Sequence, residues 1–225
     1  MKNKFLPILC AAGLALPLSS QAATVTWGSV STIINATTIV TTGVTGLVGA
    51  NFAPATSPIT ANGVTFTAVT NNSSAAIGGG ITVATSGMDF TVSNANRSNV
   101  TGAFGPIMDS HTGTFGGTGT ITLSGLVDGT QYQIQFFAST NGANDLQSQT
   151  ITGGAGTSAA FGTHGAGVGK TLLGTFTASG STQVLTIQNG EPTANALTIG
   201  TLVPEPSSVL LGGLGLLGLL RRRRK

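Results

Sequence analysis

Short runs of alternating apolar and polar residues recur along the chain between residues 24 and 202. In residues 131–138, Tyr132, Ile134 and Phe136 alternate with glutamines. This period of two places apolar side chains on one face of a strand and polar side chains on the other, so we expect these three residues to be buried. The same pattern predicts strands in residues 24–29, 63–69, 80–84, 88–93, 119–126, 171–178, 182–188 and 195–202.

Turn signals separate these runs. Asp128–Gly129 lies between the strands predicted at 119–126 and 131–138, and this dipeptide favours a hairpin turn. Helix-forming residues are scarce, and glycine interrupts each candidate helix. Many short strands with turns between them predict an all-β fold, an antiparallel β-sandwich or jelly roll. Residues 23–203, about 180 in number, suffice for one well-buried domain.

The N-terminus has the three parts of a secretory signal. Lys2 and Lys4 precede an apolar run that is too short to span a membrane comfortably, and small residues follow it. We therefore predict a signal peptide over residues 1–22, with signal peptidase cutting between Ala22 and Ala23. Cys10, the single cysteine, lies inside this segment, so the mature body would have no disulfide and no cysteine-based metal site.

The C-terminus combines a short apolar run with a block of basic residues. As a helix the run would cover about 18 Å of a hydrocarbon core about 30 Å thick, which suits a transient membrane segment better than a lasting anchor. The basic block would hold the end of the chain in the cytoplasm by the positive-inside rule. The predicted membrane segment is Val209, Leu210, Leu211, Gly212, Gly213, Leu214, Gly215, Leu216, Leu217, Gly218, Leu219 and Leu220. The basic stop is Arg221, Arg222, Arg223, Arg224 and Lys225.

Pro204, Glu205 and Pro206 stand directly before this apolar run. A Pro-Glu-Pro motif, an apolar stretch and an arginine-rich end resemble the PEP-CTERM sorting signal of exported proteins from Gram-negative bacteria that make exopolysaccharide. The resemblance covers residues 204–225. It implies recognition by an exosortase, a transpeptidase-like membrane protease, and removal of the tail near the motif. It also implies a transient inner-membrane intermediate and delivery to the cell surface or extracellular matrix.

The body carries a second resemblance, which rests on strand and turn patterns. The segments "NGVTFTAV", "ITLSGLVDGTQYQIQFFAS" and "LLGTFTASGSTQVLTI" follow one another before "NALTIGTLVPEPSS". This order resembles secreted bacterial domains that carry the same sorting tail and look like carbohydrate-binding β-sandwiches. The resemblance implies a fold more than a ligand.

The formal charge of +3 comes from the two ends of the chain. Between residues 23 and 203 only Arg97 and Lys170 are basic, against five acidic residues, which leaves a net of three negative charges. The body therefore has no basic cluster that could bind nucleic acid.

Residues with catalytic or metal-binding chemistry are few. His111 and His164 are the only histidines, and Asp109 stands two residues before the first of them. No nucleophile motif or HExxH pattern accompanies them, so we expect no catalytic residues and no enzyme, and a secreted hydrolase is the least favoured alternative. Asp128, Asn144 and Asp145 are oxygen donors without EF-hand spacing, so we expect no cofactor while leaving a structural calcium ion open.

Sugar binding needs an aromatic ring that can stack on a sugar face. Trp27 and Tyr132 both lie in strand patterns that favour core packing. An amide-rich face could still hold polysaccharide weakly and many times over; its members are Gln131, Gln133, Gln135 and Gln147. We therefore predict a structural or adhesive matrix protein associated with exopolysaccharide and biofilm, with a carbohydrate-binding module as the main alternative.

Overall fold

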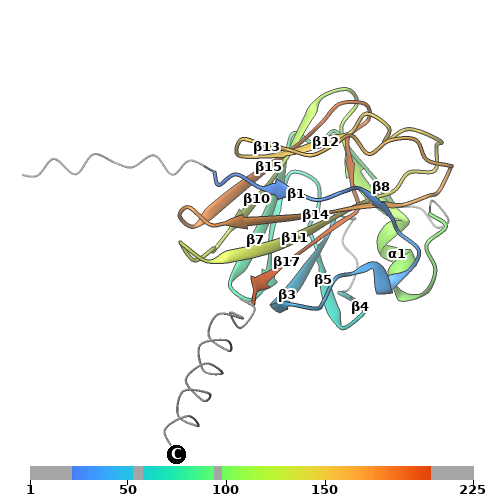
Figure 1. Cartoon of the computed structure of the whole chain (residues 1–225). Coiled ribbons are helices and arrows are strands. Elements are labelled where there is room, and N and C mark those ends of the chain that lie inside the picture. Colours follow the sequence, from blue (N-terminus) through green and yellow to red (C-terminus); the bar gives the residue numbers. More distant parts are fainter. Residues whose placement is uncertain (1–21, 53–57, 94–97, 204–225) are drawn as a thin grey trace, which may run out of the picture.

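Two large β-sheets face each other across a hydrophobic core in the computed structural model (Figure 1). The structure describes residues 22–52, 58–93 and 98–203. Sheet A has eight strands in the order β1-β14-β11-β17-β3-β5-β4, with β2 beside β14. Its strands are β1 (Thr26–Trp27), β2 (Ser31–Thr32), β3 (Val44–Asn51), β4 (Ile59–Ala61), β5 (Val64–Ala68), β11 (Gln131–Ala138), β14 (Lys170–Thr177) and β17 (Ala196–Leu202).

Sheet B has six strands in the order β13-β12-β15-β10-β7-β6. They are β6 (Ser74–Gly78), β7 (Ile81–Ser86), β10 (Thr118–Ser124), β12 (Thr150–Gly153), β13 (Gly156–Thr157) and β15 (Thr182–Gln188). A small sheet C has the order β16-β9-β8 and consists of β8 (Phe90–Ser93), β9 (Ser110–Gly113) and β16 (Thr193–Ala194). Three short helices complete the described elements: η1 (Ala36–Thr38), η2 (Gly102–Phe104) and α1 (Gly105–Met108).

The main core lies between sheets A and B and follows the alternating pattern. Ile134 and Phe136 of β11 are fully buried against Ile121 and Leu123 of β10 and their neighbours. Burying each such side chain stabilises the fold by about 1.5–3 kcal/mol. Tyr132 is also buried in this core, as expected. The prediction of a mainly β fold is confirmed, whereas the jelly-roll connection stays a prediction.

A second core covers part of the outer face of sheet A. Phe104 of η2 packs edge-on against Phe137 of β11, with ring centroids 5.0 Å apart, and tilts against Phe66 of β5 at 5.7 Å. Ile107 and Met108 of α1 are buried in the same cluster. This outer layer of short helices, in which α1 lies over one end of the sheet, was not predicted from the sequence (Figure 1).

The outer layer also buries glutamines that we expected to face solvent. Gln133 and Gln135 retain only 9% and 1% of their exposed area. The Gln135 amide donates to Thr38 O at 2.9 Å, and its carbonyl oxygen accepts from Val40 N at 2.9 Å. The prediction that these two glutamines form an exposed face is wrong, and in the case of Gln135 the reason is that the η1 segment lies over it.

The connection between β10 and β11 passes from sheet B to sheet A. These strands do not pair with each other, since β10 pairs with β7 and β15 whereas β11 pairs with β14 and β17. The predicted hairpin at Asp128–Gly129 is therefore wrong. Beside it, the β14–β15 connection passes from sheet A back to sheet B. Gly129 N donates to Ala178 O at 2.9 Å and Gly180 N to Asp128 Oδ1 at 2.7 Å, which ties the two crossovers together.

Strand β3 lies inside sheet A although no strand was predicted there. Glycines interrupt its alternating pattern, and Gly49 is needed because a Cβ at that position would lie 2.6 Å from Cδ1 of Phe66. It pairs antiparallel with β17 and parallel with β5. The sandwich is thus mainly, but not wholly, antiparallel.

Both ends of the described body are held by hydrogen bonds. Val25 is buried, and its amide donates to Gly153 O at 3.0 Å. Trp27 is half-buried against the main core, as expected, and its Nε1 donates to Gly156 O at 3.1 Å. At the other end, β17 is flanked by β11 and β3, and Val203 N donates to Gly43 O at 2.9 Å.

The predicted targeting segments fall largely outside the described residues. Of the signal peptide, residues 1–22, the structure describes only Ala22, so the cut before Ala23 stays a prediction. The sorting signal, residues 204–225, lies wholly outside. Among the described residues there is no helix long and apolar enough to cross a membrane.

Candidate functional site

One face of sheet C forms the floor of a pocket of about 270 Å³. Phe90 of β8 lies opposite Gly113 of β9, which lies opposite Thr193 of β16. Val92 lies opposite His111 in the adjacent row. Because directly paired residues share a face of a sheet, these side chains and the bare Gly113 line one surface.

An exposed phenyl ring stands at this pocket. Phe115, in the loop after β9, is 69% exposed and stacks on Phe90 with centroids 4.4 Å apart and ring planes 33° apart. Phe90 in turn meets the His111 ring edge-on at 5.9 Å. Gly113 makes room for this stack, since a Cβ there would lie 2.7 Å from Cζ of Phe90. One side of Phe115 is thus covered by Phe90 and the rest of the ring faces water.

Asp89 holds the Phe115 loop in place. Its carboxylate accepts hydrogen bonds from the Thr114 hydroxyl and, at 3.2 Å, from the Phe115 amide. The Asp89 amide donates to Gly113 O at 2.8 Å, and Thr114 N donates to Pro192 O at 3.1 Å. The aromatic residue therefore sits on a backbone that is fixed on both sides of the loop, and its exposure is a property of a defined conformation.

Oxygen-bearing side chains form the rim of the pocket. Asp145, Glu191, Thr140 and Asn141 line it together with the aromatic residues. The Asp145 carboxylate lies directly over Gly142, where an added Cβ would come within 2.0 Å of Oδ2. No lysine or arginine is among the described residues that line the pocket. The rim is therefore rich in hydrogen-bond acceptors and negatively charged.

Thr193 brings a buried hydroxyl to the same pocket. The residue is 1% exposed, and within the described part of the chain its Oγ1 has no hydrogen-bond partner. Its backbone is fixed by the buried Gln149, which donates from Nε2 to Thr193 O at 2.9 Å and accepts from Thr193 N at 3.0 Å. A buried hydroxyl without a partner costs about 1–3 kcal/mol.

The structure brings together two residues that the sequence placed apart. His111 and Asp145 line the same pocket. Asp109 instead accepts from Ser98 N at 2.9 Å and Ser98 Oγ at 3.1 Å. His164 lies in the loop between β13 and β14, and its amide donates to Asn144 Oδ1, in the loop between β11 and β12, at 2.9 Å.

The oxygen donors considered for calcium are divided between two regions. Asp128 caps Gly180 at the paired crossovers, whereas Asn144 and Asp145 belong to the loop between β11 and β12. The described residues contain no group of three or more His, Cys, Asp or Glu side chains that could hold a metal ion. A structural calcium ion stays an untested prediction.

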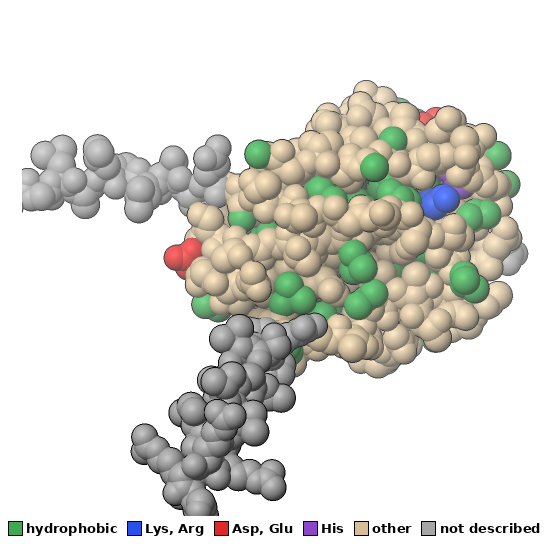
Figure 2. Space-filling model, in the orientation of Figure 1, with side chains coloured by type: hydrophobic (Ala, Val, Ile, Leu, Met, Phe, Trp, Pro, Cys, Tyr) green, Lys and Arg blue, Asp and Glu red, His purple; other side chains and the backbone are tan. Residues whose placement is uncertain are grey.

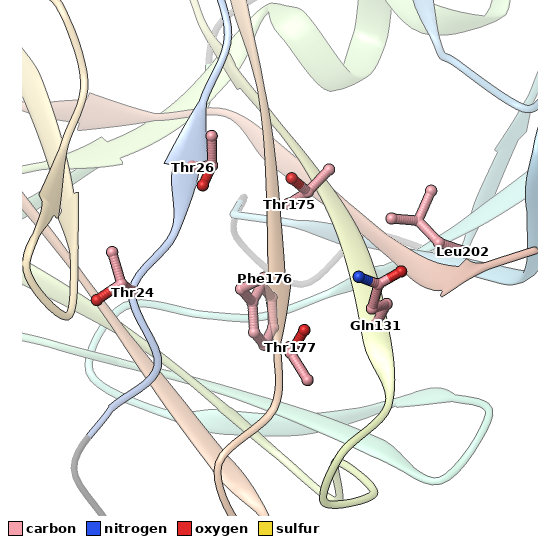
Figure 3. A pocket seen from close by; sticks show the side chains of 7 residues that line it. All are labelled: Thr24, Thr26, Gln131, Thr175, Phe176, Thr177 and Leu202. Atoms are coloured by element: carbon pink, nitrogen blue, oxygen red, sulfur yellow. The ribbon is translucent and has the colours of Figure 1, made fainter. Parts of the chain in front are cut away.

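A second groove, of about 300 Å³, lies on the outer face of sheet A (Figure 3). Its walls carry threonine hydroxyls and the amide of Gln131, one of the glutamines proposed to hold polysaccharide weakly. Leu202, at the end of β17, lines the groove beside them. The lining residues are Thr24, Thr26, Gln131, Thr175, Phe176, Thr177 and Leu202. The surrounding surface is mostly polar and uncharged, with only scattered charges on the face shown in Figure 2.

Sequence reasoning missed the Phe90–Phe115 pair. It looked for a tryptophan or tyrosine platform, and both such residues lie against the main core. A usable signal was the position of Phe115 in "HTGTFGGTG", where an aromatic residue interrupts a loop rich in glycine and threonine. A residue in such a loop is not flanked by paired strands that would bury its side chain.

The fold and site define a β-rich body with a small aromatic and acidic pocket. The comparison with known families adds the class of protein: residues 202–225 match the PEP-CTERM protein-sorting motif. This motif implies exosortase-dependent export, exosortase as the processing partner, and localisation at the cell surface or outside the cell. No curated protein and no solved structure matches the chain.

Proposed function

We propose that this protein is an exported, exosortase-processed component of the cell surface or extracellular matrix, with a structural or adhesive role in exopolysaccharide. The observation that carries the proposal is the sorting motif at residues 202–225, directly behind the last strand of a folded body. The role is non-enzymatic. Charged residues make up only 7% of the chain, and a polar, uncharged surface suits a hydrated polysaccharide matrix.

The position of the motif supports release of an intact domain. Strand β17 ends at Leu202, and Val203 is still bound to Gly43 through its amide. Cleavage near Pro204–Pro206 would therefore leave the described strands untouched. The apolar residues 209–220 and the basic residues 221–225 act before that cut, as the transient membrane segment and its cytoplasmic stop.

Intact mass and terminal peptides of the protein from the native extracellular matrix test this proposal. We expect a product that begins near Ala23 and ends near Pro204, because both targeting segments are removed. Additional mass in hexose-sized steps would show that the product is also glycosylated. A membrane-bound product that retains Arg221–Lys225 would contradict exosortase processing and would indicate a plain membrane-anchored surface protein.

A carbohydrate-binding module is the second candidate function. The observation that favours it is the exposed Phe115 ring beside the acceptor-rich rim of the sheet C pocket. An apolar ring face next to oxygen acceptors is the combination that sugar recognition requires.

A further inference from the structure

We propose that the sheet C pocket binds one neutral pyranose ring of an extracellular polysaccharide. Phe115 would supply the stacking surface, and Asp145 and Glu191 would accept hydrogen bonds from the sugar hydroxyls. The proposal rests on the proposed function for the source of the sugar. It assigns the ligand to a defined place in the fold.

The Phe115 ring is held in a position in which a ligand can reach it from solvent. An exposed phenylalanine normally folds back onto the surface, because its apolar area is expensive to hydrate. Phe115 is instead held 69% exposed by its stack on Phe90 and by the Asp89 hydrogen bonds to its loop. The C–H face of a pyranose is the flat, weakly apolar surface that fits such a ring.

The rim determines what kind of sugar is accepted. Ionised Asp145 and Glu191 are acceptors only, and pyranose hydroxyls are donors that match them. A uronic acid would place its carboxylate beside these two with no lysine or arginine among the described lining residues to compensate. The charge of the pocket therefore favours neutral over anionic sugars.

The size of the pocket limits the ligand further. A pocket of about 270 Å³ lies just below the range of about 300–1,000 Å³ that is typical of sites for drug-sized ligands, which suits one sugar ring.

Saturation-transfer difference NMR with two matched probes tests the proposal. Methyl glucoside and methyl glucuronide differ only in the group at C6, which is neutral in the first and a carboxylate in the second. We expect the glucoside, or the corresponding galactoside or mannoside, to receive saturation through its C–H protons. The glucuronide should receive much less. The protein is taken in the form that the producing cells export, or from their membranes in detergent if it is retained there.

Two variants locate the binding. Phe115→Ala should weaken glycoside binding about tenfold or more, since it removes the stacking surface. Ile34→Ala is the matched control, because Ile34 is also a large exposed apolar residue, 72% exposed, and does not line the pocket. The double variant Asp145→Asn with Glu191→Gln should reduce the preference for the glucoside over the glucuronide. Thermal unfolding confirms that each variant is folded.

Two results would overturn the assignment: no saturation of any neutral glycoside, or binding that Phe115→Ala leaves unchanged. These failures are distinct from failure of the proposed function. A correctly processed matrix protein that binds no glycoside would refute the site alone. A membrane-retained protein that binds glycosides through Phe115 would refute exosortase processing and leave the site intact.

Discussion

Asn195 joins three parts of the fold through one buried side chain. Its Oδ1 accepts from Ser139 N at 2.6 Å, and its Nδ2 donates to Met108 O and Ser110 O, both at 2.8 Å. The residue is fully buried directly before β17. It therefore fixes the end of β11 and the start of β9, and with them the small sheet that carries the pocket.

An isosteric substitution tests this role. Asn195→Asp keeps the shape of the side chain. It replaces the Nδ2 donor with a carboxylate oxygen, which then lies against the carbonyl oxygens of Met108 and Ser110. We expect the free energy of unfolding to fall by about 3 kcal/mol or more, since buried polar groups lose their partners and a charge is buried. Urea unfolding measures it, with Asn189→Asp as control, because Asn189 makes an exposed hydrogen bond to Thr150 Oγ1. Equal losses of stability in both variants would show that the buried hydrogen bonds of Asn195 contribute no more to stability than the exposed one of Asn189.

At the residue scale, sequence patterns predicted burial better than exposure. Tyr132 was correctly assigned to the core, and the partly buried Trp27 packs against it, because alternation directly reports the face that meets the opposite sheet. The burial of Gln135 was not predicted, because alternation does not show whether another layer covers the polar face of the strand. Phe115 was missed because a loop residue has no periodic pattern, and its position depends on Phe90 of β8 and on Asp89 directly before that strand.

The paired crossovers are the element that most distinguishes this sandwich from a simple meander. Gly125 and Gly129 both have positive φ, of 84° and 73°, at the two ends of the β10–β11 connection. A Cβ at Gly125 would lie 2.0 Å from Gly80 O, whereas a Cβ at Gly129 would meet nothing within 4 Å. The two positions share the backbone requirement and differ in packing.

Alanine substitutions separate these two effects. Gly129→Ala should cost about 1 kcal/mol of stability, which is the backbone strain of a left-handed conformation. Gly125→Ala should cost several times as much, since the backbone of the neighbouring β6–β7 turn must also move. Thermal or urea unfolding of both variants gives the comparison. Similar losses would mean that the crossover does not depend on its close contact with Gly80.

At the element scale, the strands were predictable and their partners were not. Residues 182–188 were predicted as a strand and form β15 with the same bounds, because the apolar Leu185 and Ile187 alternate with polar residues. The Asp128–Gly129 turn was also recognised. A local turn signal does not encode the sheet that the next strand joins, and this is why the hairpin was wrong. Strand β3 was missed because Gly46 and Gly49 interrupt its alternating pattern.

At the scale of the whole molecule, both ends of the described body are held within the sheets. The described body begins with a strand bonded across both sheets and ends with a strand inside sheet A. Each of the predicted cleavage sites lies immediately outside these strands. If the two predicted cuts are made there, both targeting segments are removed without loss of a described strand.

The basic end is the part of the tail whose role can be tested without changing the fold. In our proposal the positive charge of Arg221–Lys225 holds the end of the chain in the cytoplasm. Replacing these residues with serine or glutamine should therefore let the apolar segment pass through the membrane before exosortase meets the Pro204–Pro206 motif. We expect unprocessed or misplaced precursor to accumulate, as measured by mass and immunoblot of membrane and matrix fractions. Lys170→Gln, which removes a positive charge from β14 in the body, is the control and should be processed normally. Normal processing of the tail variant would show that the motif and the apolar segment suffice, and that the arginines serve another purpose.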